Sequence, residues 1–311
     1  MTNNDHDDAV SSPGTAASSA STTFPNPLGV HALVWTGSCT SEAVREAAQQ
    51  TAAAGFDLLE FSLHDLDAFD TQRARKDLAD AGLQVVGSRG LAPEADVSST
   101  DPAVVARGVE LLHRSVDVLA DMGGHFLSGA LYSAFGKYPS PVSAAGRANA
   151  VAALAELAPY AAERSVTLGL EVCNRYETNV VNTAHDALRL ADDIGADNVV
   201  IHLDSYHMNI EEADFVTPIR EVGDRLGYMH IGENHRGYLG SGHIDFDAFF
   251  GALAGIGYTG PLTFESFSST VVAEPLSSNL AIWRNLWDDN VDLATKARTF
   301  MGDGLTAAYG S

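Results

Sequence analysis

Short apolar runs recur along the chain with the composition of strands buried on both faces. They are rich in Val, Ile, Leu and Phe and too short to be spanning helices. Eight such runs occur, at residues 29–35, 56–63, 83–90, 124–131, 166–172, 198–204, 226–232 and 261–266. This pattern predicts eight buried strands.

Amphipathic stretches separate these runs and carry helix start and stop signals. Residues 40–55 begin at Thr-Ser and stop at Gly55, and residues 101–123 begin with Asp-Pro and end at a glycine. Residues 246–260 close with two glycines. Alternation of strand and helix predicts a parallel sheet. Eight units favour a closed (β/α)₈ TIM barrel over an open doubly wound sheet. No GxGxxG follows the first run, so a dinucleotide-binding fold is disfavoured.

The two ends of the chain differ from this repeating pattern. Residues 1–27 are rich in Ser, Thr, Ala and Asp and have neither an apolar h-region nor a basic n-region. They predict a disordered tail rather than a signal peptide. Residues 28–311 then form a single domain with a C-terminal helical extension. Within residues 276–305, one or two helices are expected, with Trp283, Leu286 and Trp287 on one face that packs on the barrel or joins subunits.

Composition narrows the classes of partner. The chain has 311 residues, 45% hydrophobic and 19% charged, with a formal net charge of −23. Such a surface repels phosphate backbones, so we expect no nucleic-acid partner. Two cysteines make a disulfide framework improbable and fit a cytoplasmic location. No apolar run reaches 18 residues, so we expect no membrane partner.

Metal-ligating side chains stand near the ends of four consecutive predicted strands. They are Glu171, Asp204, His230 and Glu265. Chemistry in this fold lies at the C-terminal ends of the strands, so the four should meet there. A lone carboxylate at a strand end is more often a cap or an ion-pair partner. Three together would repel one another unless a cation or a proton neutralises them.

The ligand types indicate which cation fits. Three carboxylates and one imidazole suit Mn²⁺, Mg²⁺ or Co²⁺ better than a thiolate-seeking metal. We therefore expect a divalent metal cofactor, with Mn²⁺ preferred. Coordination positions would remain for two adjacent substrate oxygens.

Four segments resemble the ketose 3-epimerases, a family that includes D-tagatose, D-allulose (psicose) and L-ribulose 3-epimerases. The segments are EVCNRYETN (171–179), HLDSYHMNIEE (202–212), HIGENHRG (230–237) and TFESFSS (263–269). The similarity runs from about residue 29 to about residue 300 and implies the xylose isomerase-like barrel. The segment at 202–212 is the most specific of the four.

This resemblance implies a role for each matching residue. Glu171 and Glu265 would be both metal ligands and the two acid/base groups that act on opposite faces of C3. The metal would polarise the neighbouring carbonyl and hold the enediolate charge. Glu177, His207 and Arg236 would bind the O1–O3 end of the sugar. Each has a simpler alternative: an ion pair with the neighbouring Arg175 for Glu177, a helix-capping or packing role for His207, and a surface position for Arg236.

The far end of the sugar, C4 to C6, should contact the loops that follow the first four strands. His31 replaces an aromatic residue of the tagatose-epimerase branch and is a substrate-binding candidate. Further pocket candidates are Trp35, Leu63, Ser88 and Tyr132. An apolar far end would discriminate weakly, because one extra CH₂OH changes binding by only about 1–3 kcal/mol. No basic phosphate cradle is visible, so we expect free ketoses as substrates: D-fructose/D-allulose, D-tagatose/D-sorbose and L-ribulose/L-xylulose.

Other functions on the same scaffold remain open. An aldose–ketose or hydroxypyruvate-type isomerase would share the metal site but move the proton between C1 and C2. An endonuclease-like phosphodiesterase would need more histidine ligands and a basic face. A sugar-binding barrel would leave two carboxylates beside C3 without a purpose. The resemblance favours an enzyme, an isomerase that assembles as a homodimer or homotetramer.

Overall fold

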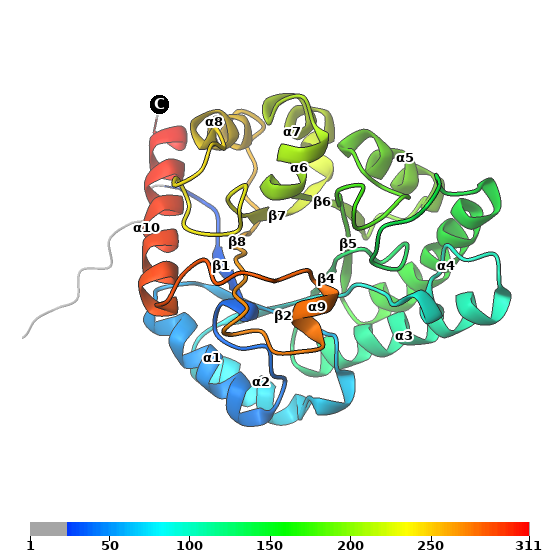
Figure 1. Ribbon diagram of the computed structural model, residues 1–311, viewed down its shortest axis with the longest axis horizontal. Coiled ribbons are helices and arrows are strands. Elements are labelled where there is room, and N and C mark those ends of the chain that lie inside the picture. Colours follow the sequence, from blue (N-terminus) through cyan, green and yellow to red (C-terminus); the bar gives the residue numbers. More distant parts are fainter. Residues whose placement is uncertain (1–23, 311) are drawn as a thin grey trace, which may run out of the picture.

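Eight parallel strands close into a barrel in the computed structural model, which describes residues 24–310 (Figure 1). The strands follow one another around the barrel in chain order, and the first pairs with the last. They are β1 (Leu28–His31), β2 (Leu58–Ser62), β3 (Gln84–Ser88), β4 (Phe126–Ser128), β5 (Thr167–Glu171), β6 (Val199–Asp204), β7 (Leu226–Ile231) and β8 (Leu262–Phe264). Seven lie inside a predicted run and β1 begins one residue before its run, so the predicted barrel is confirmed.

Helices surround the barrel, and the short α9 lies over its mouth (Figure 1). They are α1 (Ser41–Ala53), α2 (Thr71–Asp80), α3 (Pro102–Asp121), α4 (Ala144–Glu163), α5 (Ala184–Ile194), α6 (Ser205–Glu211), α7 (Val216–Val222), α8 (Phe246–Gly255), α9 (Leu276–Asn279) and α10 (Asn290–Tyr309). The predicted boundary signals act as expected for α1. Thr40 caps its first turn, and Gly55 just beyond it has a φ of +80°, a conformation that favours glycine. No helix among the described residues is long and apolar enough to cross a membrane.

The barrel interior changes from apolar to polar along the strands. Leu58, Val86 and Tyr228 form a small cluster inside it, separate from the large core between strands and helices. Side chains two residues further along a strand face the same side. Glu60 and His230 therefore follow Leu58 and Tyr228 into the interior, toward the C-terminal ends of the strands. This polar layer is the floor of the candidate site.

Both chain ends correct the sequence predictions in detail. Residues 24–27 were assigned to the tail, but Asn26 is buried and donates hydrogen bonds to the carbonyls of Tyr258 and Gly260. The ordered chain therefore starts before residue 28. The remainder of the predicted tail, residues 1–23, lies outside the described residues.

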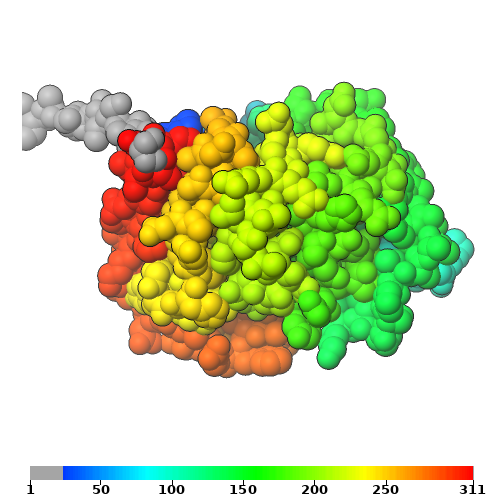
Figure 2. Space-filling model, turned by 90° about the horizontal axis from the view of Figure 1, so that it is seen from above, coloured from blue at the N-terminus to red at the C-terminus, as the bar shows by residue number. Residues whose placement is uncertain are grey.

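The C-terminal segment contains two helices, but they do not include the predicted aromatic face. Residues 280–289 lie between α9 and α10 and cross the barrel mouth (Figure 1). Trp283, Leu286 and Trp287 are therefore not on one helix: Trp287 is buried, whereas Trp283 is 79% exposed. The helical extension α10 packs on α8, where the rings of Phe246 and Phe300 are 5.1 Å apart, and the two surfaces adjoin in Figure 2.

Candidate active site

The four predicted metal ligands meet at one end of the barrel. Glu171 and Asp204 are the last residues of β5 and β6, His230 is near the end of β7, and Glu265 follows β8 directly. Parallel register places Asp204 beside His230. All four are buried. The expectation that these residues meet follows from strand closure, since each occupies the same level of its own strand.

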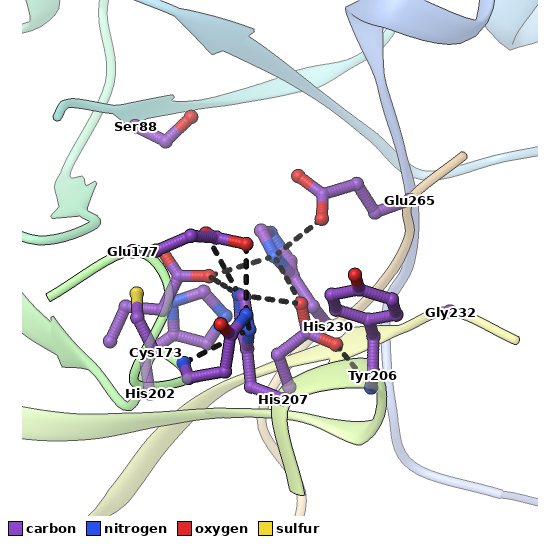
Figure 3. Close-up of polar contacts among 12 residues, drawn as sticks. Ser88, Cys173, Glu177, His202, Tyr206, His207, His230, Gly232 and Glu265 are labelled. Carbon is purple, nitrogen blue, oxygen red and sulfur yellow. Dashed lines mark hydrogen bonds and ion pairs between the residues drawn. The ribbon is translucent and has the colours of Figure 1, made fainter. Parts of the chain in front are cut away.

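His230 is at the centre of this group (Figure 3). Its Nδ1 lies 3.7 Å from Glu171 Oε1, 3.9 Å from Asp204 Oδ2 and 3.6 Å from Glu265 Oε2. These distances are too long for hydrogen bonds. Among the described residues, His230 Nδ1 and Asp204 Oδ2 have no hydrogen-bond partner although both are buried.

The buried, unpartnered Nδ1 of His230 is the observation that tests whether these residues fit a metal. Ligand atoms of Asp204, His230 and Glu265 all lie within 4.8 Å of one another, as do those of Glu171, His202 and His230. A cation among them would satisfy the free nitrogen and would join Arg236 in balancing the charge of Asp204. Carboxylate oxygens and imidazole nitrogen are donors that first-row and alkaline-earth divalent ions accept. The residues present therefore fit a divalent cation.

The charges of the cluster shift the pKa values of its members strongly. Burial alone would lower the pKa of His230, but Glu60 and Glu265 raise it well above its ordinary value. Burial raises the pKa of Glu265 to about 7, with Arg236 opposing the rise. Burial opposes ionisation of Glu171 too, yet the neighbouring histidines hold its pKa well below the usual range. The pKa values of Glu171 and Glu265 are therefore shifted in opposite directions within one site.

His207 lies in α6 with its imidazole turned into the site. Its Nδ1 accepts hydrogen bonds from Asn174, so Nε2 carries the proton. Nε2 lies 3.6 Å from Glu171, 3.6 Å from Asp204 and 3.8 Å from Glu177. A donor with fixed orientation, and not a capping histidine, therefore faces the cavity.

Glu177 lines the same cavity and does not pair with its neighbouring arginine. Asn174 donates to its Oε1 at 2.8 Å. Arg175 instead forms an ion pair with Glu211 of α6, whose side chain is buried. The alternative reading of Glu177 as a local ion-pair partner is therefore wrong.

Arg236 is buried, so its reading as a plain surface arginine is also wrong. Its guanidinium contacts Asp204 at 3.1 Å and Glu265 at 2.6 Å, and lies 4.0 Å from the centre of the Tyr206 ring. Its φ is +62°, a conformation that a non-glycine residue adopts at an energetic cost. Ser266 holds this backbone by donating to the carbonyl of Arg236.

A cavity of about 400 Å³ opens above this cluster. Its lining includes five of the predicted substrate-side residues, Glu177, His207, Arg236, His31 and Ser88. Phe135, Phe267 and residues 279–284 line the same cavity. Its size and its mixture of aromatic and polar walls are those of a small-molecule site.

Three far-end candidates do not line this cavity. Trp35 packs in the core and donates to Thr51, and Leu63 is fully buried. Tyr132 is fully buried as well, and its hydroxyl donates to the carbonyl of Glu171 at 2.6 Å. Tyr132 therefore supports the backbone of a proposed ligand instead of shaping the pocket.

Several contact residues were not recognised in the sequence. Tyr206 stacks under Arg236, Asn174 orients His207, and Glu60 hydrogen-bonds His230. His202 lies in the floor with its ring centre 4.2 Å from that of His230. Tyr206 and His202 both stand within the motif at 202–212, so their position beside Asp204 was a usable signal. No motif around Glu60 indicated that it would contact the site.

Comparison with known proteins agrees with this geometry. Residues 48–294 match the family described as xylose isomerase-like TIM barrel, so the chain belongs to that family. Among curated relatives, a ketose 3-epimerase of Arthrobacter globiformis is 53% identical over 90% of this chain and 97% of its own length. An L-ribulose 3-epimerase of Methylomonas sp. is 49% identical over 89% and 98%. The chain is thus a member of the ketose 3-epimerases, which are isomerases.

Solved structures give the same result. A D-allulose 3-epimerase from Methylomonas sp., crystallised in complex with D-allulose, superposes with a TM-score of 0.88. It is 48% identical and covers 90% of this chain and 97% of its own. The resemblance inferred from four short segments therefore extends over the whole barrel.

Proposed function

We propose that this protein is a divalent-metal-dependent epimerase of free ketoses that inverts C3. The observation that carries the proposal is the position of His230 Nδ1, unpartnered between Glu171, Asp204 and Glu265. The allulose- and ribulose-acting relatives supply the substrate class. We expect three pairs of substrates: D-fructose/D-allulose, D-tagatose/D-sorbose and L-ribulose/L-xylulose.

Glu171, Asp204, His230 and Glu265 would hold the cation, with Mn²⁺ as the expected ion and Mg²⁺ or Co²⁺ as alternatives. When bound, such a cation acts as a Lewis acid toward the C2 carbonyl and balances negative charge on the sugar oxygens.

Glu171 and Glu265 would move the proton. Inversion at C3 needs one group to take the proton from one face and a second to return a proton to the other. Both carboxylates lie within 3.7 Å of the same imidazole nitrogen, and they come from different strands, β5 and β8. Asp204 and His230 would be ligands only.

Arg236, His207 and Glu177 would bind the O1–O3 end. Arg236 and the Nε2–H of His207 are donors beside the carboxylate cluster, suited to oxygens that gain negative charge. Glu177 accepts from a sugar hydroxyl. His31 and Ser88 also line the cavity and would contact the far end of the sugar. A homodimer or homotetramer remains a prediction.

Metal removal tests the proposal. The protein is stripped with EDTA, and D-fructose conversion is followed by chromatography before and after Mn²⁺ or Mg²⁺ is returned. We expect at least a hundredfold loss on stripping and recovery with Mn²⁺, with D-allulose as the product. Full activity after stripping would contradict the metal assignment. An aldose product would instead indicate a C1–C2 isomerase.

A further inference from the structure

A buried carboxylate beneath the four ligands has no part in the function proposed above. Glu60 lies in β2, and its side chain is fully buried inside the barrel. An isolated ionised carboxylate is costly to bury, so its partners must compensate. The contacts of its two oxygens indicate what it does.

One oxygen of Glu60 carries both of its hydrogen bonds. Oε2 is 2.8 Å from His230 Nε2 and accepts from the Tyr228 hydroxyl at 2.7 Å. The other oxygen, Oε1, lies 3.8 Å from Nε2 of His31 and has no hydrogen-bond partner among the described residues. Glu60 therefore touches a proposed ligand from below, on the side away from the other three.

The hydrogen bond to Glu60 decides which nitrogen of His230 is free. An ionised carboxylate only accepts hydrogen bonds, so Nε2 must be the donor. The lone pair of the neutral ring is then on Nδ1, the atom that faces Glu171, Asp204 and Glu265. The opposite tautomer would place a proton where the cation should bind.

We propose that Glu60 is a positioning residue for the metal: it fixes the tautomer and the ring orientation of His230 and makes Nδ1 a stronger donor. The inference rests on the proposed function for the presence of a metal. Histidine ligands in proteins commonly donate their second N–H to a carboxylate, and loss of that partner typically weakens metal binding 10–100-fold.

The test measures Mn²⁺ affinity in place of turnover. EDTA-stripped wild type and Glu60→Gln are titrated with Mn²⁺, and free Mn²⁺ is counted by its EPR signal. Gln keeps the volume of Glu60 and can still accept from His230, but it lacks the charge. We expect binding weakened about 10–100-fold, with an unchanged circular dichroism spectrum.

Asp96→Asn is the matched control. Asp96 is a second buried carboxylate, it accepts from Tyr138 at 2.7 Å and from the backbone N–H of Ser98, and it contacts none of the four ligands. We expect the Mn²⁺ affinity of Asp96→Asn to stay within about twofold of wild type, because the Asp96 carboxylate has only structural contacts. Tyr228→Phe removes one hydrogen bond to Glu60 and keeps the charge, so it should weaken binding less than Glu60→Gln.

Wild-type affinity in folded Glu60→Gln would overturn the proposal, as would an equal loss in Asp96→Asn. If Glu60→Gln does not fold, Tyr228→Phe decides, and an unchanged affinity counts against a positioning role. Mn²⁺ affinity and ketose conversion are measured separately, so failure of this inference can be distinguished from failure of the proposed function. Glu60-dependent Mn²⁺ binding without ketose conversion removes the proposed reaction alone, and normal conversion with wild-type affinity in Glu60→Gln removes this inference alone. A wild type that binds no Mn²⁺ removes both.

Discussion

Glu265 is the residue whose substitution bears most directly on the proton transfer. Burial raises its pKa to about 7 in the metal-free cluster, and its carboxylate lies 3.6 Å from His230 Nδ1 at the centre of the site. We expect Glu265→Gln to lower kcat by about 10²–10⁴-fold, the usual contribution of a general acid or base. The assay uses D-fructose at saturating Mn²⁺, so that weakened metal binding is offset.

Glu212→Gln serves as the control for that substitution. Glu212 ends α6 and accepts from the backbone of Ala184, away from the cavity lining. Its variant should keep wild-type kcat. Turnover in Glu265→Gln within tenfold of wild type would exclude Glu265 as an acid/base group.

The role of some residues can be predicted from the sequence, whereas the role of others cannot. The four ligand candidates stand near strand ends, and the fold fixes where strand ends meet, so their convergence could be predicted. Glu60 stands in the middle of an apolar run, where the sequence does not show which side chain it faces. Its partner His230 is 170 positions away. Tyr132 was misplaced for a related reason, since only the packed structure shows that its hydroxyl reaches a backbone carbonyl.

Asp204 both caps the first turn of α6 and contributes a carboxylate to the proposed metal site. Its Oδ1 accepts from the N–H of Tyr206 and so caps α6, the helix that carries His207. Its Oδ2 faces His230 Nδ1 at 3.9 Å and contacts Arg236 at 3.1 Å. One carboxylate thus has two tasks that two substitutions can separate.

We expect Asp204→Asn and Asp204→Ala to differ in stability but not in metal binding. Asn caps helices as well as Asp does, whereas Ala costs about 1 kcal/mol. Both variants lose the anionic ligand and should bind Mn²⁺ at least tenfold more weakly. Urea unfolding of the metal-free proteins measures the first effect and Mn²⁺ titration the second. Equal stability of the two variants would argue against the cap.

Elements were predictable where local pattern and tertiary environment agree. Eight apolar runs became eight strands because each is buried on both faces, between the barrel interior and the helices. Residues 280–289 show the opposite case. Their aromatic spacing fits a helix, but the chain crosses the barrel mouth and Trp287 is anchored by a hydrogen bond to Ser266. That tertiary contact overrides the local preference.

At the scale of the molecule, a polar barrel interior makes stability depend on pH. Burial lowers the pKa of His31 and of His202 from 6.5 to about 4. These two histidines therefore bind more protons in the unfolded chain than in the folded one between these values, and their contribution to stability falls as pH decreases from 6.5 toward 4. The raised pKa of Glu265 acts in the opposite direction. Each histidine contributes about 2 kcal/mol of this loss by pH 5.

His202→Gln should remove its share of that pH dependence. Urea unfolding of the metal-free protein at pH 6.5 and pH 5 measures the slope for wild type and variant. His185→Gln is the control, because His185 lies on the surface and pairs with Glu221. An unchanged slope in His202→Gln would show that His202 accepts a proton in the folded state.

Closure of the whole barrel was the most predictable feature of all. It follows from counting units and from the rule that parallel strands need crossover helices. The mouth was least predictable, because its shape depends on loops of irregular conformation. Arg236 illustrates this, since its positive φ is set by the contacts of its loop and not by its residue type.

The exposed Trp283 gives the molecule a built-in optical reporter. The chain has three tryptophans, of which Trp35 and Trp287 are buried and Trp283 alone is exposed. Because Trp283 lines the cavity, a sugar or inhibitor entering there changes the polarity around one indole while the other two stay in constant surroundings. Fluorescence from that ring follows occupancy of the entrance without any attached dye.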